Sequence, residues 1–220
     1  MKFLNHSLLL LCLLFSATAQ AREVILIFGD SLSAGYGLAA NQAWPDLLRR
    51  RLESDPATRH RWKVVNASVS GETTAGGLTR LPAALSAHRA AIVVLELGAN
   101  DGLRGLPLDT MHDNLAAMIR DIRRSGAKVL LVGIHLPPNY GTPYTERFNG
   151  VYTALARENK LTLVPSLLAD VETKPELFQS DGLHPVAAAE NTIAGTIWPY
   201  LLPLLTTRRV SMGHFGLTGT

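Results

Sequence analysis

The chain is poor in cysteine and carries no long apolar span beyond its first residues. Its only cysteine is Cys12, in a chain of 220 residues. We expect residues 1–21 to be a cleaved secretory signal, because Lys2 precedes an apolar run over residues 8–15 and an Ala-Gln-Ala site at residues 19–21. That run is too short to remain as a membrane anchor. The mature chain would be periplasmic or secreted, without disulfides or thiol chemistry.

The chain also lacks a strong charge excess and the short motifs of metal and nucleotide sites. It has 21 basic and 18 acidic residues. The one dense basic cluster, residues 49–51, suits the end of a helix better than a nucleic-acid surface. There is no His-Glu-x-x-His, Cys-x-x-Cys or Walker loop. We therefore expect no metal, no cofactor and no nucleic-acid partner, but a small-molecule substrate and a monomeric protein.

Short apolar runs alternate with helix-like segments along the rest of the chain. Runs that are apolar throughout indicate a parallel sheet covered on both faces. We predict an α/β fold, a three-layer α/β/α sandwich around a mostly parallel five-stranded sheet, in one domain over residues 22–205, followed by a loose tail over 206–220. The predicted strands are 24–28, 63–66, 91–97, 128–134 and 161–164, and the predicted helices are 45–52, 78–85, 108–125, 146–159 and 185–205.

Two polar segments at opposite ends of this domain suggest nucleophilic chemistry. A Gly-Asp-Ser-Leu run at residues 29–32 follows the first predicted strand, so Ser31 would lie at the rim of the sheet, where ligands bind. A serine hydroxyl needs a base. His184, three residues after Asp181, is the candidate, and together the two segments predict a serine hydrolase. Ser33 breaks the Gly-x-Ser-x-Gly elbow, which argues against the larger α/β-hydrolase fold.

Loops after the next two predicted strands supply hydrogen-bond donors at the same edge. One loop carries Gly71 and the next carries Asn100. Ester hydrolysis needs donors aimed at the oxygen where negative charge develops. The backbone N–H groups of Ser31 and Gly71 and the side-chain amide of Asn100 are therefore the candidate oxyanion hole.

These residues carry a resemblance to a known family. The chain resembles the GDSL-type hydrolases of the SGNH superfamily, whose four sequence blocks match here at Ser31, Gly71, Asn100 and His184 over residues 23–205. More narrowly, it is similar to the periplasmic multifunctional thioesterase, arylesterase and lysophospholipase group. The stretches that carry this closer likeness are residues 97–105 and 136–141, with Ala99 where many members have glycine.

The resemblance implies the role of each site residue. Ser31 would be the nucleophile, His184 the general base and then acid, and Asp181 the group that orients His184. The implied activity is cleavage of acyl esters and thioesters, including aryl and alkyl esters, acyl-CoA-type thioesters and lysophospholipids. Of the other histidines, only His135, which follows a predicted strand, is a candidate to line the pocket.

The substrate pocket is expected from apolar residues in loops near the site. They suit an acyl chain better than a sugar, although a carbohydrate O-deacetylase and a binding module without turnover remain alternatives. The residues are Leu78, Leu103, Leu106, Pro107, Leu108, Pro137 and Pro138.

Three further segments lead to specific expectations. We expect residues 73–81 to form a loop that moves on acyl binding, because Gly76 and Gly77 relax the backbone there. Glu96, inside an apolar run, is expected to be a hydrogen-bonded structural carboxylate. The Ser-Gly-Ala-Lys run at residues 125–128 matches a Ser–Lys catalyst by letter but is expected to be a plain turn at the opposite edge of the sheet.

Overall fold

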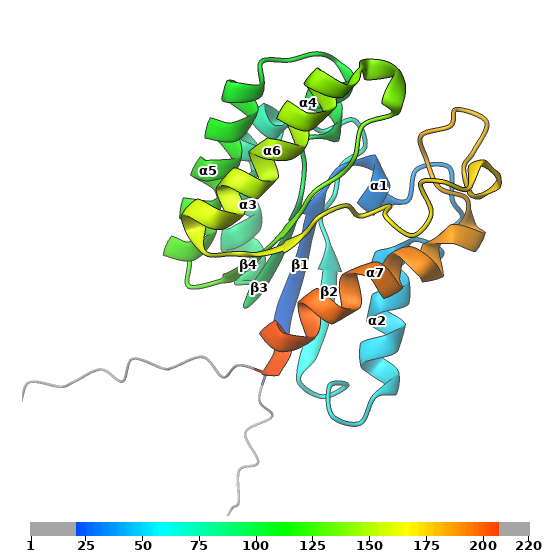
Figure 1. Cartoon of the computed structure of the whole chain (residues 1–220). Coiled ribbons are helices and arrows are strands. Elements are labelled where there is room, and N and C mark those ends of the chain that lie inside the picture. Colours follow the sequence, from blue (N-terminus) through cyan, green and yellow to red (C-terminus); the bar gives the residue numbers. More distant parts are fainter. Residues whose placement is uncertain (1–20, 207–220) are drawn as a thin grey trace, which may run out of the picture.

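Five parallel strands form the centre of the protein (Figure 1). The computed structural model describes residues 21–206. The strand order is β2-β1-β3-β4-β5, and every pairing is parallel. The predicted α/β fold with a five-stranded sheet is thus confirmed. The strands are β1 (Glu23–Gly29), β2 (Trp62–Asn66), β3 (Ile92–Glu96), β4 (Lys128–Val132) and β5 (Thr162–Val164).

Helices cover both faces of the sheet. In Figure 1, α3, α5 and α6 lie together on one side, while α2 and α7 lie together on the other. The helices are α1 (Ser31–Ala34), α2 (Trp44–Ser54), α3 (Thr74–His88), α4 (Ala99–Leu103), α5 (Leu108–Arg124), α6 (Thr142–Asn159) and α7 (Ala187–Thr206), with 3-10 turns η1 (Pro138–Tyr140) and η2 (Pro175–Leu177). Because both faces are covered, all five residues of β3 are buried.

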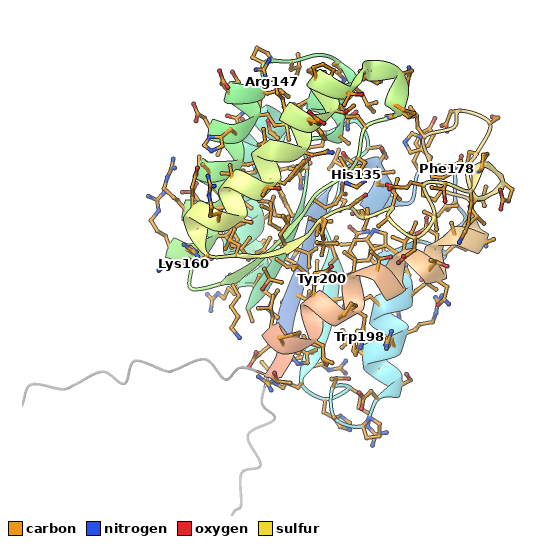
Figure 2. The ribbon with its side chains drawn as sticks, in the orientation of Figure 1. His135, Arg147, Lys160, Phe178, Trp198 and Tyr200 are labelled. Atoms are coloured by element: carbon orange, nitrogen blue, oxygen red, sulfur yellow. The ribbon has the colours of Figure 1, made fainter. Side chains whose placement is uncertain are left out.

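The basic cluster at residues 49–51 belongs to the α2–α7 layer. The Arg51 guanidinium lies 3.8 Å from the centre of the Trp198 ring, which Figure 2 labels on α7. A guanidinium at this distance from an indole face is stabilised by a cation–π interaction. Arg51 therefore helps to hold the two helices together and is not simply a solvated end of α2.

Helix α3 begins four residues earlier than predicted. The Thr73 side chain accepts a hydrogen bond from the Gly76 N–H at 3.3 Å, which caps the first turn. The Asp101 carboxylate accepts from both the N–H and the hydroxyl of Thr74, at 2.8 and 2.6 Å. The expectation of a mobile loop over residues 73–81 is therefore wrong, because Gly76 and Gly77 lie inside a capped helix.

The last helix extends one residue beyond the predicted end of the domain. Helix α7 continues through Thr206, the first residue of the predicted tail, although Pro199 and Pro203 lie inside it. The predicted signal peptide and the rest of the predicted tail lie outside the described residues. Within residues 21–206, no helix has the length and apolar character needed to cross a membrane.

Glu190 joins α7 to the beginning of α2. Its carboxylate accepts a hydrogen bond of 2.6 Å from the Trp44 N–H, the first amide of α2. Ala43, the residue before the helix, provides no side-chain cap. Burial raises the pKa of Glu190 from 4.5 to about 7, against the opposing effect of the Trp44 hydrogen bond. The folded state therefore binds a proton that the unfolded state releases between about pH 4.5 and 7.

Replacing Glu190 by glutamine should remove this pH dependence. The stability that Glu190 contributes in its protonated form is lost as pH rises through about 7, because ionisation costs more in the folded state. Glutamine keeps the acceptor oxygen and cannot ionise. The difference in Tm between Glu190→Gln and wild type should therefore grow in favour of the variant from pH 5 to pH 8. The expected change is roughly 2–4 °C for each kcal/mol of difference in the free energy of unfolding.

Circular-dichroism melts of both proteins at the two pH values measure this difference. Glu190→Ala is the control, since it loses the acceptor and should lower Tm at both. An equal Tm difference between the glutamine variant and wild type at pH 5 and pH 8 would contradict the assignment.

Candidate active site

Ser31, His184 and Asp181 form one hydrogen-bonded chain. Ser31 begins α1 directly after β1, and the other two residues lie in the turn before α7. The distance from Ser31 Oγ to His184 Nε2 is 2.9 Å, and that from His184 Nδ1 to Asp181 Oδ2 is 2.7 Å. Because an ionised carboxylate only accepts, Nδ1 donates to Asp181, and Nε2 of the neutral ring accepts from the serine hydroxyl. The structure therefore brings the three predicted residues together in the hydrogen-bonded order of a Ser-His-Asp triad.

Asp181 is held in its ionised form by its own turn. Its Oδ1 accepts from the backbone N–H groups of Leu183 and His184, at 2.9 and 3.0 Å. Burial alone would raise the pKa of Asp181, but these bonds and that from the His184 ring together lower it to about 2. A carboxylate that stays charged at neutral pH can orient the ring and stabilise its protonated form.

Tyr36 and Gln179 support the histidine from the solvent side. The Tyr36 ring lies 4.5 Å from the His184 ring, centre to centre. The Gln179 amide donates to the backbone oxygens of Tyr36 and Pro185, at 2.8 and 2.9 Å. The segment after α1 and the turn that carries His184 are thereby joined. Neither residue was predicted from the sequence, since nothing in the local pattern around them indicates a contact across the fold.

The candidate oxyanion donors meet beside Ser31. Gly71 has φ +77°, a conformation that residues with a side chain rarely adopt. Within residues 21–206, the backbone N–H groups of Ser31 and Gly71 have no protein acceptor. The Arg104 guanidinium donates to the backbone oxygen of Gly71 at 3.1 Å and to Asn100 Oδ1 at 3.4 Å. Arg104 therefore fixes which way the Asn100 amide points.

The Asn100 amide already donates both its hydrogens. Nδ2 lies 3.0 Å from the backbone oxygen of Glu72 and 3.2 Å from Asp30 Oδ2. The other oxygen of Asp30 accepts from the Leu32 N–H at 3.0 Å and caps α1. Burial raises the pKa of the Asp30 carboxyl to about 6. Asp30 thus connects the start of α1 to the side-chain amide of Asn100, a role that its place in the sequence motif did not reveal.

Glu96 is a structural carboxylate, as predicted. It accepts from the Ser33 hydroxyl at 2.6 Å and from the Asp30 N–H at 3.4 Å. Burial, reinforced by nearby Asp30, raises the pKa of Glu96 well above its ordinary value. A β-carbon at Gly29 would lie only 2.5 Å from Glu96 Oε2, so the glycine of the motif leaves room for this carboxylate.

A cavity of about 840 Å³ opens beside the triad. Its walls come mainly from apolar side chains after β4 and β5 and from the triad and oxyanion segments. This volume is within the range of small-molecule sites. The apolar residues that line it are Leu32, Ala99, Leu103, Ile134, Leu136, Pro137, Pro138, Leu168, Pro175, Phe178 and Leu183.

Of the seven predicted substrate residues, three line this cavity: Leu103, Pro137 and Pro138. The other four do not. Leu108 is buried at the start of α5, Pro107 precedes it, and Leu78 packs against the core from α3. Leu106 is exposed. The prediction for these four is therefore corrected: in their place, the segment between β5 and α7 contributes much of the wall. Its irregular sequence carries no periodicity that could have revealed this.

His135 and Glu172 both line the cavity and make one part of its wall polar. Figure 2 shows it near α1, at the end of the sheet where the strands finish. Its Nδ1 lies 3.1 Å from both carboxylate oxygens of Glu172, and the Ser166 hydroxyl donates to the same carboxylate at 3.3 Å. Among residues 21–206 there is no group of three histidine, cysteine or acidic side chains that could hold a metal ion.

Known proteins are similar to this chain in sequence and in fold. The Esterase TesA of Pseudomonas aeruginosa is 47% identical over 195 residues, which cover 89% of this chain and 96% of that protein. The Thioesterase 1/protease 1/lysophospholipase L1 of Escherichia coli is 41% identical over 200 residues, or 91% and 93% of the two chains. A crystal structure of TesA aligns with a TM-score of 0.80 at 48% identity, covering 83% of this chain and 99% of that one.

A family model agrees with these relatives. It is described as the GDSL-like Lipase/Acylhydrolase family and matches residues 27–190. The matched range begins in β1 and extends past His184 into α7, so it includes the triad, the oxyanion donors and every strand of the sheet apart from the start of β1. The chain therefore belongs to the GDSL-like lipase/acylhydrolase family.

Proposed function

We propose that this protein is a serine hydrolase that cleaves acyl esters and thioesters through an acyl-enzyme on Ser31. The observation that carries the proposal is the hydrogen-bonded chain from Ser31 through His184 to Asp181, with its serine in the wall of a largely apolar cavity. Relatives named esterase and thioesterase/lysophospholipase support the substrate class. The cavity suits an acyl chain, because most of the side chains that line it are apolar.

The first half of the reaction transfers the acyl group to the enzyme. Ser31 Oγ attacks the carbonyl carbon while His184 Nε2 takes the hydroxyl proton. The carbonyl oxygen gains negative charge as the tetrahedral intermediate forms. When this intermediate collapses, the C–O or C–S bond breaks, and His184 returns its proton to the departing alkoxide or thiolate. Asp181, ionised throughout, stabilises the imidazolium between these two steps.

Water completes the cycle. It attacks the acyl carbon of the ester on Ser31 and gives a proton to His184, which then protonates Ser31 Oγ as the carboxylic acid leaves. In both halves the oxyanion lies near the amides of Ser31 and Gly71 and the Asn100 side chain. Because both hydrogens of the Asn100 amide are already donated, the oxyanion would replace the longer bond, to Asp30.

We further propose that the mature protein is a periplasmic or secreted monomer. The predicted signal peptide at residues 1–21 supports export, and the catalytic domain over residues 22–205 supplies all triad and oxyanion groups from one chain. Detection of the chain in a periplasmic or culture fraction beginning at Arg22, and its elution at monomer size, tests these points.

Ser31→Ala should abolish ester hydrolysis. Members of a catalytic triad act as a unit, so kcat for p-nitrophenyl butyrate should fall by about 10⁴-fold or more. Release of p-nitrophenol measures it. Ser125→Ala is the control: this serine follows α5, close to the start of β4, whereas the site lies at the ends of the strands. Its hydroxyl donates to the Ile122 carbonyl at 2.6 Å. A folded Ser31→Ala protein with half of wild-type turnover would refute the proposed nucleophile.

Asn100→Ala should lower kcat by about 10²–10³-fold with little change in KM. The reason is that Asn100 stabilises the oxyanion more than the ground-state carbonyl. Steady-state kinetics on the same ester separate the two parameters. A variant in which KM alone changed would move Asn100 from stabilising the transition state to binding substrate.

Leu168→Phe should shift the preference toward short acyl chains. Leu168 is buried in the cavity wall, so a larger side chain takes up space that a long acyl group needs. We expect kcat/KM for a decanoate ester to fall about fivefold or more relative to an acetate ester. Leu106→Phe, at an exposed position outside the cavity, is the matched control. A chain-length change in the control alone would favour the acyl site that the sequence predicted.

A further inference from the structure

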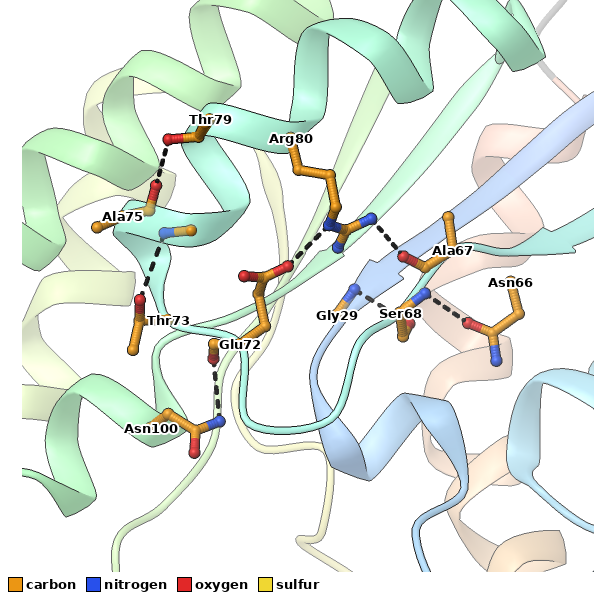
Figure 3. Close-up of polar contacts among 11 residues, drawn as sticks. Gly29, Asn66, Ala67, Ser68, Glu72, Thr73, Ala75, Thr79, Arg80 and Asn100 are labelled. Carbon is orange, nitrogen blue, oxygen red and sulfur yellow. Dashed lines mark hydrogen bonds and ion pairs between the residues drawn. The ribbon is translucent and has the colours of Figure 1, made fainter.

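The loop that carries Gly71 is closed by one arginine. This loop runs over residues 67–73, between β2 and α3. Arg80, in the second turn of α3, points back toward it (Figure 3). Its Nη1 donates to the backbone oxygen of Ala67 at 2.6 Å, and its Nε donates to Glu72 Oε2 at 2.7 Å. A single planar guanidinium therefore joins the beginning of the loop to its end, with Gly71 between the two contacts.

The guanidinium also contacts the strand that leads to Ser31. It lies 4.1 Å from the centre of the Phe28 ring, at the end of β1. Cations at this distance from an aromatic face are attracted to it. On the same strand, the Gly29 N–H donates to the Ser68 hydroxyl at 3.1 Å (Figure 3). The loop and the Ser31 segment are thus joined both through Arg80 and directly.

Glu72 connects this arrangement to the third oxyanion donor. Its side chain is held by Arg80, and its backbone oxygen accepts from the Asn100 amide at 3.0 Å. Any displacement of Glu72 would move the acceptor that holds Asn100 and the peptide that follows Gly71. Arg80 is therefore linked through Phe28, Glu72 and the loop to all three candidate donors.

The ion pair between Arg80 and Glu72 is largely shielded from solvent. The Glu72 side chain is only 12% exposed and that of Arg80 30%. Arg80 Nη2 is buried without a hydrogen-bond partner among residues 21–206. A buried donor without a partner costs free energy. The two hydrogen bonds that the guanidinium does make run to two points of the loop, so its planar fork fixes their relative position.

Gly76 provides independent evidence for the same arrangement. It lies in the first turn of α3, where glycine is less favourable than alanine by about 1 kcal/mol. A β-carbon there would lie only 2.2 Å from Glu72 Oε1. No positive φ requires glycine at this position. The feature that an alanine would disturb is therefore the place of the Glu72 carboxylate.

We propose that Arg80 and Glu72 are positioning residues that hold the oxyanion donors Gly71 and Asn100 in place for the transition state. This inference rests on the proposed ester hydrolysis at Ser31. Donors that are already oriented need no reorganisation when charge develops on the substrate, so their placement affects kcat. A residue that merely held the loop in the fold would affect stability and leave the kinetics of the folded protein unchanged.

Gly76→Ala separates these two roles. The methyl group should stabilise α3 while it pushes the Glu72 carboxylate away from Arg80. We expect kcat for p-nitrophenyl butyrate to fall by about tenfold or more, KM to stay within about twofold, and Tm to be unchanged or higher. Gly195→Ala in α7 is the matched control, since a β-carbon there meets nothing within 4 Å, and its kcat should equal that of wild type.

Substitutions of Arg80 and Glu72 themselves also test the positioning role. Arg80→Ala and Glu72→Ala should each lower kcat by about 10–100-fold, less than or equal to the loss of a whole donor. The double variant should be no worse than the more severe single one, because both remove one interaction. Arg80→Lys keeps the charge but cannot span both contacts, so it should recover only part of kcat.

Binding of a tetrahedral analogue provides the second readout. An alkylboronic acid that forms an adduct with Ser31 should lose affinity in Gly76→Ala by about the same factor as kcat. Wild-type kcat in Gly76→Ala and Arg80→Ala, or losses that track only the folded fraction, would overturn the inference. Ser31→Ala in the p-nitrophenyl butyrate assay distinguishes failure of the proposed ester hydrolysis from failure of the positioning role. If Ser31→Ala is inactive while the Arg80 variants retain full kcat, only the positioning role fails.

Discussion

The parallel pairing of β1 with both β2 and β3 is the constraint on which the site depends. Because the chain leaves β1 for β2 and returns to β3 on the other side, the connections diverge at the ends of these strands. Ser31 follows β1, Gly71 follows β2 and Asn100 follows β3. Three loops that are distant in sequence thus meet at one point, and Asp181 and His184 need only reach it from the turn before α7.

At this point the polar groups bind one another before any substrate arrives. Asn100 is held by Glu72 and Asp30, and Asp30 also caps α1. Buried polar groups are costly unless they are paired, so such a network has few alternative arrangements. The site therefore gains rigidity from contacts that would contribute little to stability on a solvated surface. The exceptions are the backbone N–H groups of Ser31 and Gly71, which have no protein acceptor within residues 21–206.

The sequence predicted the parts of the fold that depend on local pattern. Apolar runs gave the five strands, and the motif around Ser31 and that around His184 gave the residues that the structure brings together. It did not predict the start of α3, because two glycines suggested a loop, while the Thr73 cap and the contact between Thr74 and Asp101 decide the local structure. The cavity wall was missed for a similar reason. The segment between β5 and α7 is shaped by tertiary contacts, and no periodicity records them.

Glycine at this site is required for two different reasons, and the difference explains that error. Gly71 has a positive φ, which turns the backbone so that its N–H is available. Gly29 and Gly76 instead provide space for the carboxylates of Glu96 and Glu72, respectively. A glycine of the second kind lies in regular strand or helix geometry and indicates no flexibility. Its meaning depends on a side chain elsewhere in the fold, so the structure is needed to distinguish a glycine that bends the chain from one that makes room.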